Sequence, residues 1–198
     1  MGVVTKTGDT GDTARFGGAR IPKHHPSVVA NGDVDELNSA IGMLAALATL
    51  PSDIGADLII IQERCFVIGA ELATLADAAV DVQTYIPRID EQDIELLEQR
   101  ISFFESQLSP QKSFLLPGGC QAASLAFWVR TVARRAERSA VAYAAQEDIS
   151  PLVVKYLNRL SDYFYILGRY CNFLEHTPEV PWNGGSGELP AQDDRRQT

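Results

Sequence analysis

In the stretch VVANGDVDELNSAIGMLAALATL, residues 28–50, apolar side chains recur at steps of three and four residues, through Val34, Leu37, Ile41 and Leu44. An α-helix turns once in about 3.6 residues, so this spacing gathers the four side chains on one face. Such a face is typical of a helix that buries one stripe against neighbours. The stretch therefore predicts a long helix packed on other helices.

The same periodicity continues beyond Pro51. Residues 53–75 and 89–108 predict two more helices, and the second of these begins with acidic residues that suit a helix N-terminus. Residues 121–146 and 151–176 predict two further helices, each about 40 Å long at about 1.5 Å per residue. Strand signals are nearly absent, because no sustained alternation of apolar and polar residues appears. We therefore expect an all-α protein, a bundle of about five helices.

The composition is that of an ordinary globular protein. The chain has 198 residues, of which 45% are hydrophobic and 22% are charged, which is enough for one buried core. We expect a single domain over residues 1–176, with the helical bundle over about residues 28–176. Residues 177–198 are crowded with proline, glycine and charge. We expect them to form a flexible tail from which only Trp182 docks.

Charge and cysteine content narrow the function classes. A net charge of -9 argues against a nucleic acid or an anionic membrane as partner, because both require a basic surface. Cys65, Cys120 and Cys171 are widely separated and lie in apolar settings, which predicts buried free thiols rather than disulfides. No stretch is apolar for long enough to span a bilayer, and no signal-peptide pattern opens the chain. We expect a cytoplasmic protein.

The fourth predicted helix contains VRTVARRAERSA, in which Arg130, Arg134 and Arg138 are four residues apart and share one face. Arg135 flanks them, and Glu137 is the single acid in the run. Like charges at this spacing destabilise a helix unless carboxylates or a bound anion compensate them. Two interpretations remain open: a solvated face paired to acids of neighbouring helices, or a polyphosphate site in which guanidinium groups bind phosphate oxygens in pairs.

A second candidate is TKTGDTGDT, residues 5–13. Glycine, threonine and aspartate expose backbone N–H groups and hydroxyls to a ligand, which is typical of a phosphate-binding loop. Lys6 and Lys23 add positive charge. The segment is neither a Walker A loop nor a Rossmann fingerprint, because GxxxxGK[ST] and a preceding strand are missing. A disordered N-terminus is the alternative.

Two further stretches carry unusual side chains. In YLNRLSDYFYILGRY, Asn158 and Asp162 lie one turn apart on an otherwise apolar helix. They either satisfy each other or a nearby arginine, or they belong to a ligand site. In SFLLPGG, residues 113–119, an apolar triplet that begins at Phe114 stands in a loop, where it either closes the end of the bundle or contacts an apolar ligand.

Five motifs together, TKTGDTGDT, GDVDELNSAIG, SFLLPGG, RTVARRAERSA and YLNRLSDYFY, resemble the PduO-type ATP:cob(I)alamin adenosyltransferases, over residues 5–173. The resemblance implies a five-helix bundle assembled as a homotrimer, with ATP bound between adjacent subunits. It also implies transfer of the 5′-deoxyadenosyl group of ATP to the cobalt of cob(I)alamin, giving adenosylcobalamin and triphosphate. Mg²⁺ is expected mainly on the ATP phosphates, and a cobalamin reductase and a B12-dependent enzyme are suggested as partners.

The resemblance also implies roles for individual residues. Residues 1–25 form a nucleotide-binding segment. Arg134 and Arg138 stabilise the leaving triphosphate, and Phe114 displaces the lower axial ligand of the corrinoid; these three are the catalytic candidates. Asp35 and Arg130 match a salt bridge between subunits. The ATP-binding positions are Thr5, Lys6, Thr7, Gly8, Thr13, Lys23, Arg134, Arg135, Glu137, Arg138 and Asn158.

Some positions depart from the family pattern. A basic or long polar residue is frequent at the Thr10 position and an aliphatic one near Arg15 or Phe16, and Asp12 adds negative charge close to the expected phosphates. These departures concern nucleotide affinity more than the reaction.

Two rival functions come from other classes. A corrinoid carrier or chaperone on the same scaffold would bind cobalamin without converting it, and would not need the ATP-binding residues. A ferritin-like di-metal bundle requires Glu-x-x-His pairs on facing helices. The three histidines, His24, His25 and His176, form no such pair, and we expect surface roles for His24 and His25.

Overall fold

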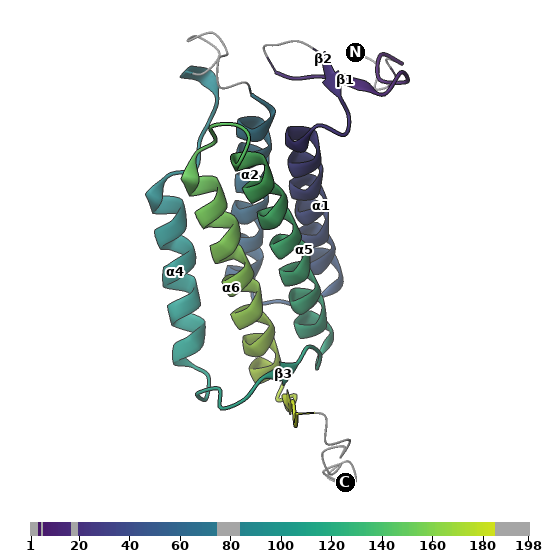
Figure 1. The fold of residues 1–198 in the computed structure, drawn as a ribbon. Coiled ribbons are helices and arrows are strands. Elements are labelled where there is room, and N and C mark those ends of the chain that lie inside the picture. Colours follow the sequence, from purple (N-terminus) through teal and green to yellow (C-terminus); the bar gives the residue numbers. More distant parts are fainter. Residues whose placement is uncertain (1–3, 5, 17–19, 75–83, 185–198) are drawn as a thin grey trace.

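Five long helices lie alongside one another in the computed structural model, which describes residues 4, 6–16, 20–74 and 84–184 (Figure 1). α5 packs on both α1 and α6, α1 packs on α2, and α4 packs on α6. Each helix lies within a few residues of its predicted range, so the predicted bundle is confirmed. The helices are α1 (Pro26–Leu47), α2 (Ser52–Ala73), α4 (Glu91–Ser106), α5 (Gln121–Ala144) and α6 (Pro151–Leu174).

Local hydrogen bonds explain where the helices begin. The backbone N–H of Ser27 donates to the imidazole of His25, and Pro26 occupies the first turn of α1, so this helix starts earlier than the apolar pattern indicates. Asp90 and Asp93 exchange side-chain and backbone hydrogen bonds in a capping box at the start of α4. Among the described residues, no helix combines the length and the hydropathy needed to cross a membrane.

The core follows the predicted stripes. Val34, Leu37, Ile41 and Leu44 are all buried, as their spacing on α1 requires. Aromatic side chains from α4, α5 and α6 fill the centre, and the largest of them are fully buried: Phe104, Tyr143, Tyr156, Tyr163 and Phe164. The three cysteines are buried free thiols, as predicted.

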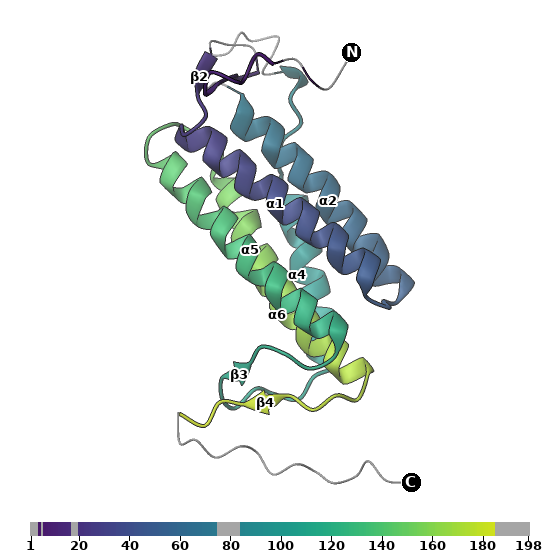
Figure 2. The ribbon, with the colours of Figure 1, turned by 90° about the vertical axis from the view of Figure 1, so that its right-hand side faces the viewer.

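The description as all-α needs a correction, because two short antiparallel ribbons lie at opposite ends of the bundle (Figures 1 and 2). β1 (Asp12–Ala14) pairs with β2 (Arg20–Pro22) at the upper end. β3 (Leu115–Leu116) pairs with β4 (Val180–Pro181) at the lower end. Strands of two or three residues are too short to produce a readable alternation. The protein is therefore mostly helical with small β elements.

Residues 177–184, which the sequence assigned to a flexible tail, lie against the lower end of the bundle. Val180 and Pro181 form β4, and the backbone N–H of Trp182 donates to the carbonyl of Phe114 at 2.7 Å. Trp182 therefore contacts the end of the bundle, as predicted, but Glu179, Val180 and Pro181 do so too, so the prediction that only Trp182 docks is wrong. The remaining tail residues, 185–198, lie outside the described part of the chain.

Candidate functional site

The N-terminal segment folds as a compact turn above the bundle. The N–H of Asp9 donates to the carbonyl of Lys6 at 3.4 Å, and the N–H of Gly11 donates to the carbonyl of Gly8 at 3.2 Å. Lys6 has a positive φ of 58° and Gly11 one of 91°. Glycine takes this conformation without strain, whereas a lysine there adopts a rarer backbone state. The turn leaves Lys6 and Thr7 exposed.

Lys23 lies directly against this turn. Its backbone N–H donates to the carbonyl of Gly11 at 2.8 Å. A Cβ atom added to Gly8 would lie 3.1 Å from the Lys23 ammonium nitrogen, so a side chain at Gly8 would push the lysine away. The β1–β2 ribbon holds Thr13 opposite Ile21. The structure therefore brings these predicted ATP-binding residues together: Lys6, Thr7, Gly8, Thr13 and Lys23. The other predicted residue of this segment, Thr5, lies outside the described residues.

Arg15 anchors this segment to the bundle. Its guanidinium donates to the hydroxyl of Tyr143 at 2.5 Å and to the carbonyl of Thr74 at 3.4 Å, and it lies 4.0 Å from a carboxylate oxygen of Glu147. The side chain is buried. Burial raises the pKa of the Tyr143 phenol, and the Arg15 charge opposes this shift. Sequence reasoning did not identify this contact, because Arg15 and Tyr143 are 128 residues apart.

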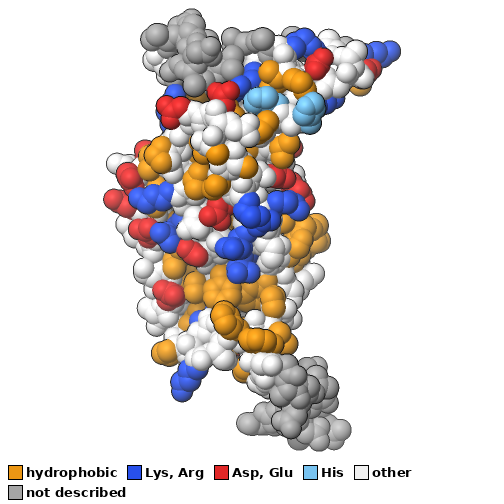
Figure 3. Space-filling view, in the orientation of Figure 1, with side chains coloured by type: hydrophobic (Ala, Val, Ile, Leu, Met, Phe, Trp, Pro, Cys, Tyr) orange, Lys and Arg blue, Asp and Glu red, His pale blue; other side chains and the backbone are white. Residues whose placement is uncertain are grey.

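The arginine-rich face of α5 is open to solvent. Arg134 and Arg138 are both exposed, and one Arg138 nitrogen donates to the Arg134 carbonyl at 3.0 Å. Within the described residues neither side chain forms an ion pair. Figure 3 shows basic side chains gathered over α5 and α6, with hydrophobic side chains below them toward β3. A polyanion could therefore approach Arg134 and Arg138 without breaking an existing ion pair.

Arg135 behaves differently from its neighbours. It lies within ion-pair distance of Asp33, at 3.5 Å, and of Glu36, both on α1. Asp33 also accepts a hydrogen bond from the hydroxyl of Ser139. Pairing to acids of a neighbouring helix thus describes Arg135, and an ATP contact of this residue stays a prediction.

Two predicted ATP-binding residues of different helices meet beside the arginines. The amide nitrogen of Asn158 on α6 donates to a carboxylate oxygen of Glu137 on α5 at 2.8 Å. Asp162, one turn further along α6, forms an ion pair with Arg159 at 2.8 Å. The polar side chains of this helix therefore have partners on the protein, and those of Asn158 and Glu137 are near the exposed arginines.

Asp35 and Arg130 do not pair with each other among the described contacts of this single chain. Asp35 is exposed on α1. The guanidinium of Arg130 lies over the ring of Tyr165, 5.5 Å from its centroid. The pairing of Asp35 with Arg130 between subunits stays a prediction.

Phe114 stands at the lower end of the bundle with 75% of its surface exposed. An apolar side chain so exposed in a loop is consistent with contact to an apolar ligand. Its ring lies edge-on to Trp182, with the ring centroids 6.2 Å apart.

The described residues contain no group of three or more histidine, cysteine or acidic side chains that could hold a metal ion. His25 is half-buried and its side chain caps α1, so its role lies at the start of this helix rather than at the surface, as had been predicted.

A profile of the cobalamin adenosyltransferase family matches residues 3–171, and the chain belongs to this family. It is 41% identical to the corrinoid adenosyltransferase of Bacillus subtilis over 175 residues, which are 87% of each chain. It is 40% identical to the corrinoid adenosyltransferase PduO of Salmonella typhimurium over 169 residues, which are 85% of this chain and 49% of that protein. The chain therefore spans about half the length of that relative.

Solved structures agree with the family. A variant PduO-type ATP:corrinoid adenosyltransferase from Lactobacillus reuteri, in which a phenylalanine is replaced by histidine, was solved with cobalamin and ATP. It superimposes with a TM-score of 0.87 at 37% identity, covering 92% of this chain and 97% of that one. A variant of the Lactobacillus reuteri enzyme with an arginine replaced by lysine, solved with ATP, has a TM-score of 0.83, also at 37% identity, covering 91% and 99%. The predicted resemblance to the PduO-type enzymes is confirmed.

Proposed function

We propose that this protein transfers the 5′-deoxyadenosyl group of ATP to the cobalt of cob(I)alamin, giving adenosylcobalamin and triphosphate. Family membership supports the reaction class. The observation that carries the proposal for this chain is the α5 face, on which Arg134 and Arg138 are exposed without an acidic partner among the described residues. Planar guanidinium groups in this state suit the oxygens of a triphosphate.

The reaction needs no nucleophile from the protein. The electron pair of Co(I) attacks the 5′ carbon of ATP, the cobalt–carbon bond forms, and the carbon–oxygen bond to the triphosphate breaks with its electrons on the leaving oxygen. The protein positions the two substrates and stabilises the charge that develops on the triphosphate. We assign this stabilisation to Arg134 and Arg138, together with Lys6 and Lys23. Mg²⁺ on the phosphate oxygens would supply further positive charge.

Phe114 is proposed to act on the corrinoid before the transfer. A hydrocarbon side chain under the corrin ring displaces the lower axial ligand and cannot coordinate cobalt itself. Loss of the axial donor lowers the energy of the orbital that accepts the electron, so four-coordinate Co(II) is easier to reduce to Co(I). The exposed position of Phe114 suits this role, because the ring can contact a ligand without moving other residues.

We further propose that the active site forms between subunits of a homotrimer. The N-terminal turn and β3, which directly follows Phe114, lie at opposite ends of one bundle (Figure 2), and α5, with its 24 residues, spans about 36 Å. One subunit therefore does not bring its own Lys6 close to its own Phe114, whereas a neighbour could place its turn over the α5 face. In that arrangement Asp35 of one subunit would pair with Arg130 of the next.

A charge exchange tests this interface. Asp35→Arg and Arg130→Asp should each shift the protein from trimer toward monomer in light scattering, and the double variant should restore the trimer, because it returns opposite charges to the contact. If all three variants keep the wild-type mass, the assigned salt bridge is wrong.

The proposal also covers the cellular compartment and the protein partners. Three buried, unpaired thiols fit a reducing compartment, so the cytoplasm remains our proposed location. A cobalamin reductase that supplies the electron and a B12-dependent enzyme that receives the product remain the proposed partners.

The deciding experiment is an anaerobic assay of the purified protein with chemically reduced cobalamin, Mg²⁺ and ATP. We expect the Co(I) absorbance to disappear as an equimolar amount of triphosphate is released. Tight corrinoid binding without triphosphate would instead support the corrinoid carrier and would overturn the proposed transfer.

A further inference from the structure

Two segments that are distant in sequence meet at the lower end of the bundle: the loop 107–120 after α4 and the segment 177–184 after α6 (Figures 1 and 2). Leu115 pairs with Pro181, and Leu116 pairs with Val180. The hydrogen bond from the Trp182 N–H to the Phe114 carbonyl extends this pairing to Phe114. The backbone of Phe114 is therefore tied to the C-terminal segment.

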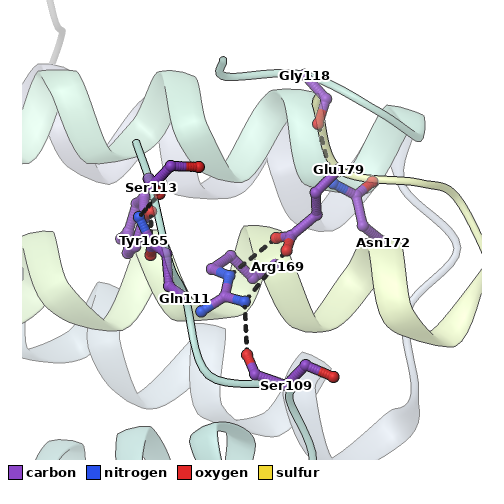
Figure 4. A network of polar contacts seen from close by, with 8 residues as sticks. All are labelled: Ser109, Gln111, Ser113, Gly118, Tyr165, Arg169, Asn172 and Glu179. Carbon is purple, nitrogen blue, oxygen red and sulfur yellow. Dashed lines mark hydrogen bonds and ion pairs between the residues drawn. The ribbon is translucent and has the colours of Figure 1, made fainter. Parts of the chain in front are cut away.

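A buried arginine fastens both segments to α6. The guanidinium of Arg169 donates to the two carboxylate oxygens of Glu179, at 2.8 and 3.1 Å, and to the carbonyl of Ser109 at 3.1 Å (Figure 4). Arg169 is buried, and such two-point contacts fix direction as well as distance. We call these contacts the Arg169–Glu179 clasp.

Asn172 on α6 fixes the other end of the loop, at residues 118–120. The side chain of Asn172 donates to the carbonyl of Gly118 at 3.0 Å and accepts from the N–H of Cys120 at 2.9 Å. Gly119, between them, has a φ of 115°, and a Cβ atom there would lie 2.0 Å from the Asn172 oxygen. Only glycine fits this position, so the observed path of the loop requires Gly119.

The side chain of Phe114 has far less support than its backbone. It is 75% exposed, and the described aromatic ring beside it is that of Trp182, itself 51% exposed. The two rings face a surface depression of about 590 Å³ that is also lined by Gln111, Lys112, Ser113 and Gly184. A side chain this exposed rotates freely unless a neighbour restricts it. Trp182 is the neighbour in place to do so.

We infer that the segment Glu179–Trp182 positions the Phe114 ring for displacement of the axial ligand, with Trp182 restricting the ring and the Arg169–Glu179 clasp holding Trp182 in place. This inference rests on the proposed role of Phe114. A ring that displaces a ligand must resist the return of that ligand, and a freely rotating ring would yield to it. Trp182 and Glu179 are accordingly positioning residues, and Phe114 is the residue that touches the corrinoid.

The test measures coordination of the cobalt directly. Cob(II)alamin is added to ATP-bound protein, and electron paramagnetic resonance gives the ratio of four- to five-coordinate Co(II). Trp182→Ala should lower this ratio roughly three- to tenfold, in line with the loss of one aromatic pair, and Trp182→Phe should restore most of it. Transfer that starts from chemically supplied Co(I) should change much less, because axial displacement is then no longer required.

Glu179→Gln tests the clasp, and Glu91→Gln is its matched control. Glu91 also pairs with a cation of α6, Lys155, at 2.8 Å, but far from the loop. We expect Glu179→Gln to lower the same ratio and Glu91→Gln to leave it unchanged. In a Trp128→Phe background Trp182 is the remaining tryptophan of the chain, so faster quenching of its fluorescence by acrylamide in Glu179→Gln would report its release.

Phe114→Ala distinguishes a failure of the proposed role of Phe114 from a failure of the inference about Trp182 and Glu179. If Phe114→Ala leaves the coordination ratio unchanged, the proposed role of Phe114 is wrong and the inference falls with it. If Phe114→Ala abolishes the four-coordinate state while Trp182→Ala and Glu179→Gln keep it at the wild-type level, only the inference is overturned. Trp182 is half exposed, so its substitution should leave the bundle folded, which thermal unfolding can verify.

Discussion

At the upper end of the bundle the N-terminal turn is held mainly by backbone groups and exposed side chains, whereas at the lower end the Phe114 loop is held by two buried side chains. The exposed Arg20 donates to the carbonyls of Thr7 and Asp12, and Arg15 provides a buried anchor. Below, Arg169 and Asn172 fix both ends of the loop through several hydrogen bonds each.

This difference suggests how the two substrates are bound. A surface fixed by buried groups loses little freedom on binding, so in the proposed function the lower end would suit a large rigid ring. A turn held by exposed groups can adjust to a flexible triphosphate and to a neighbouring subunit. Substitutions at the upper end should therefore weaken ATP binding. Substitutions at the lower end should lower the stability of the protein and change the coordination of the cobalt.

The largest effect on activity is expected at the arginine face between the two ends. Arg134→Ala should lower kcat by roughly 10²- to 10³-fold, the usual cost of removing one group that stabilises transition-state charge. Initial rates of Co(I) loss and triphosphate release measure this effect, with Lys155→Ala, an exposed cation on α6, as the control. A decrease of less than about twofold would remove Arg134 from the proposed catalytic group.

At the lower end, one added methyl group at Gly119 should lower the stability of the protein. Gly119→Ala places a Cβ against the Asn172 side chain and requires a positive φ, so it should destabilise the protein by about 2–4 kcal/mol. Gly118→Ala is the matched control, because no atom lies within 4 Å of its added Cβ. Urea unfolding at one fixed protein concentration compares the two. Equal midpoints would mean that the loop is not rigidly held.

Paired tyrosine variants test the proposed division between the ends. Tyr143→Phe removes the acceptor of Arg15 at the upper end, and the buried guanidinium then loses a partner. We expect the KM for ATP to rise by roughly 10- to 100-fold, since hydrogen bonds to charged groups are worth about 1.5–3 kcal/mol. Tyr165→Phe removes the hydroxyl that donates to Gln111 at the lower end and should leave this KM within about twofold. Similar changes in both variants would contradict the division.

Much of this architecture was predictable from the sequence, because long helices repeat their signal over many residues. The stripe through Val34, Leu37 and Ile41 predicted α1 and its buried face, and five separate motifs supported the family. The arginine spacing predicted a shared face, but it could not separate Arg134, which is exposed, from Arg135, which lies beside acids of α1.

Contacts between distant segments could not be predicted. Arg15 meets Tyr143 across 128 residues, and no local pattern in the sequence indicates this contact. Glu179 lies in a segment whose composition indicates a tail, so its bond to Arg169 became visible only in the folded chain. Gly119 is the second glycine of PGG, a pattern that indicates a turn. Its packing against Asn172 depends on α6 and could not be predicted.

The smallest expected effect concerns the cysteines, and it tests how closed the lower end is. Burial raises the pKa of the Cys171 thiol to about 12, so at pH 8 only about one molecule in 10⁴ carries the reactive thiolate. Cys120, which caps α5 beside the same loop, is buried as well, and burial raises its pKa. A disulfide reagent should therefore label almost no thiol in the native protein at pH 8 and all three in denaturant. Gly119→Ala should increase native labelling of Cys120 and Cys171, which adjoin the loop, and not that of Cys65 on α2. Mass spectrometry of the labelled peptides distinguishes these sites, and rapid labelling of Cys120 in the unmodified protein would show that the lower end opens far more often than its hydrogen bonds imply.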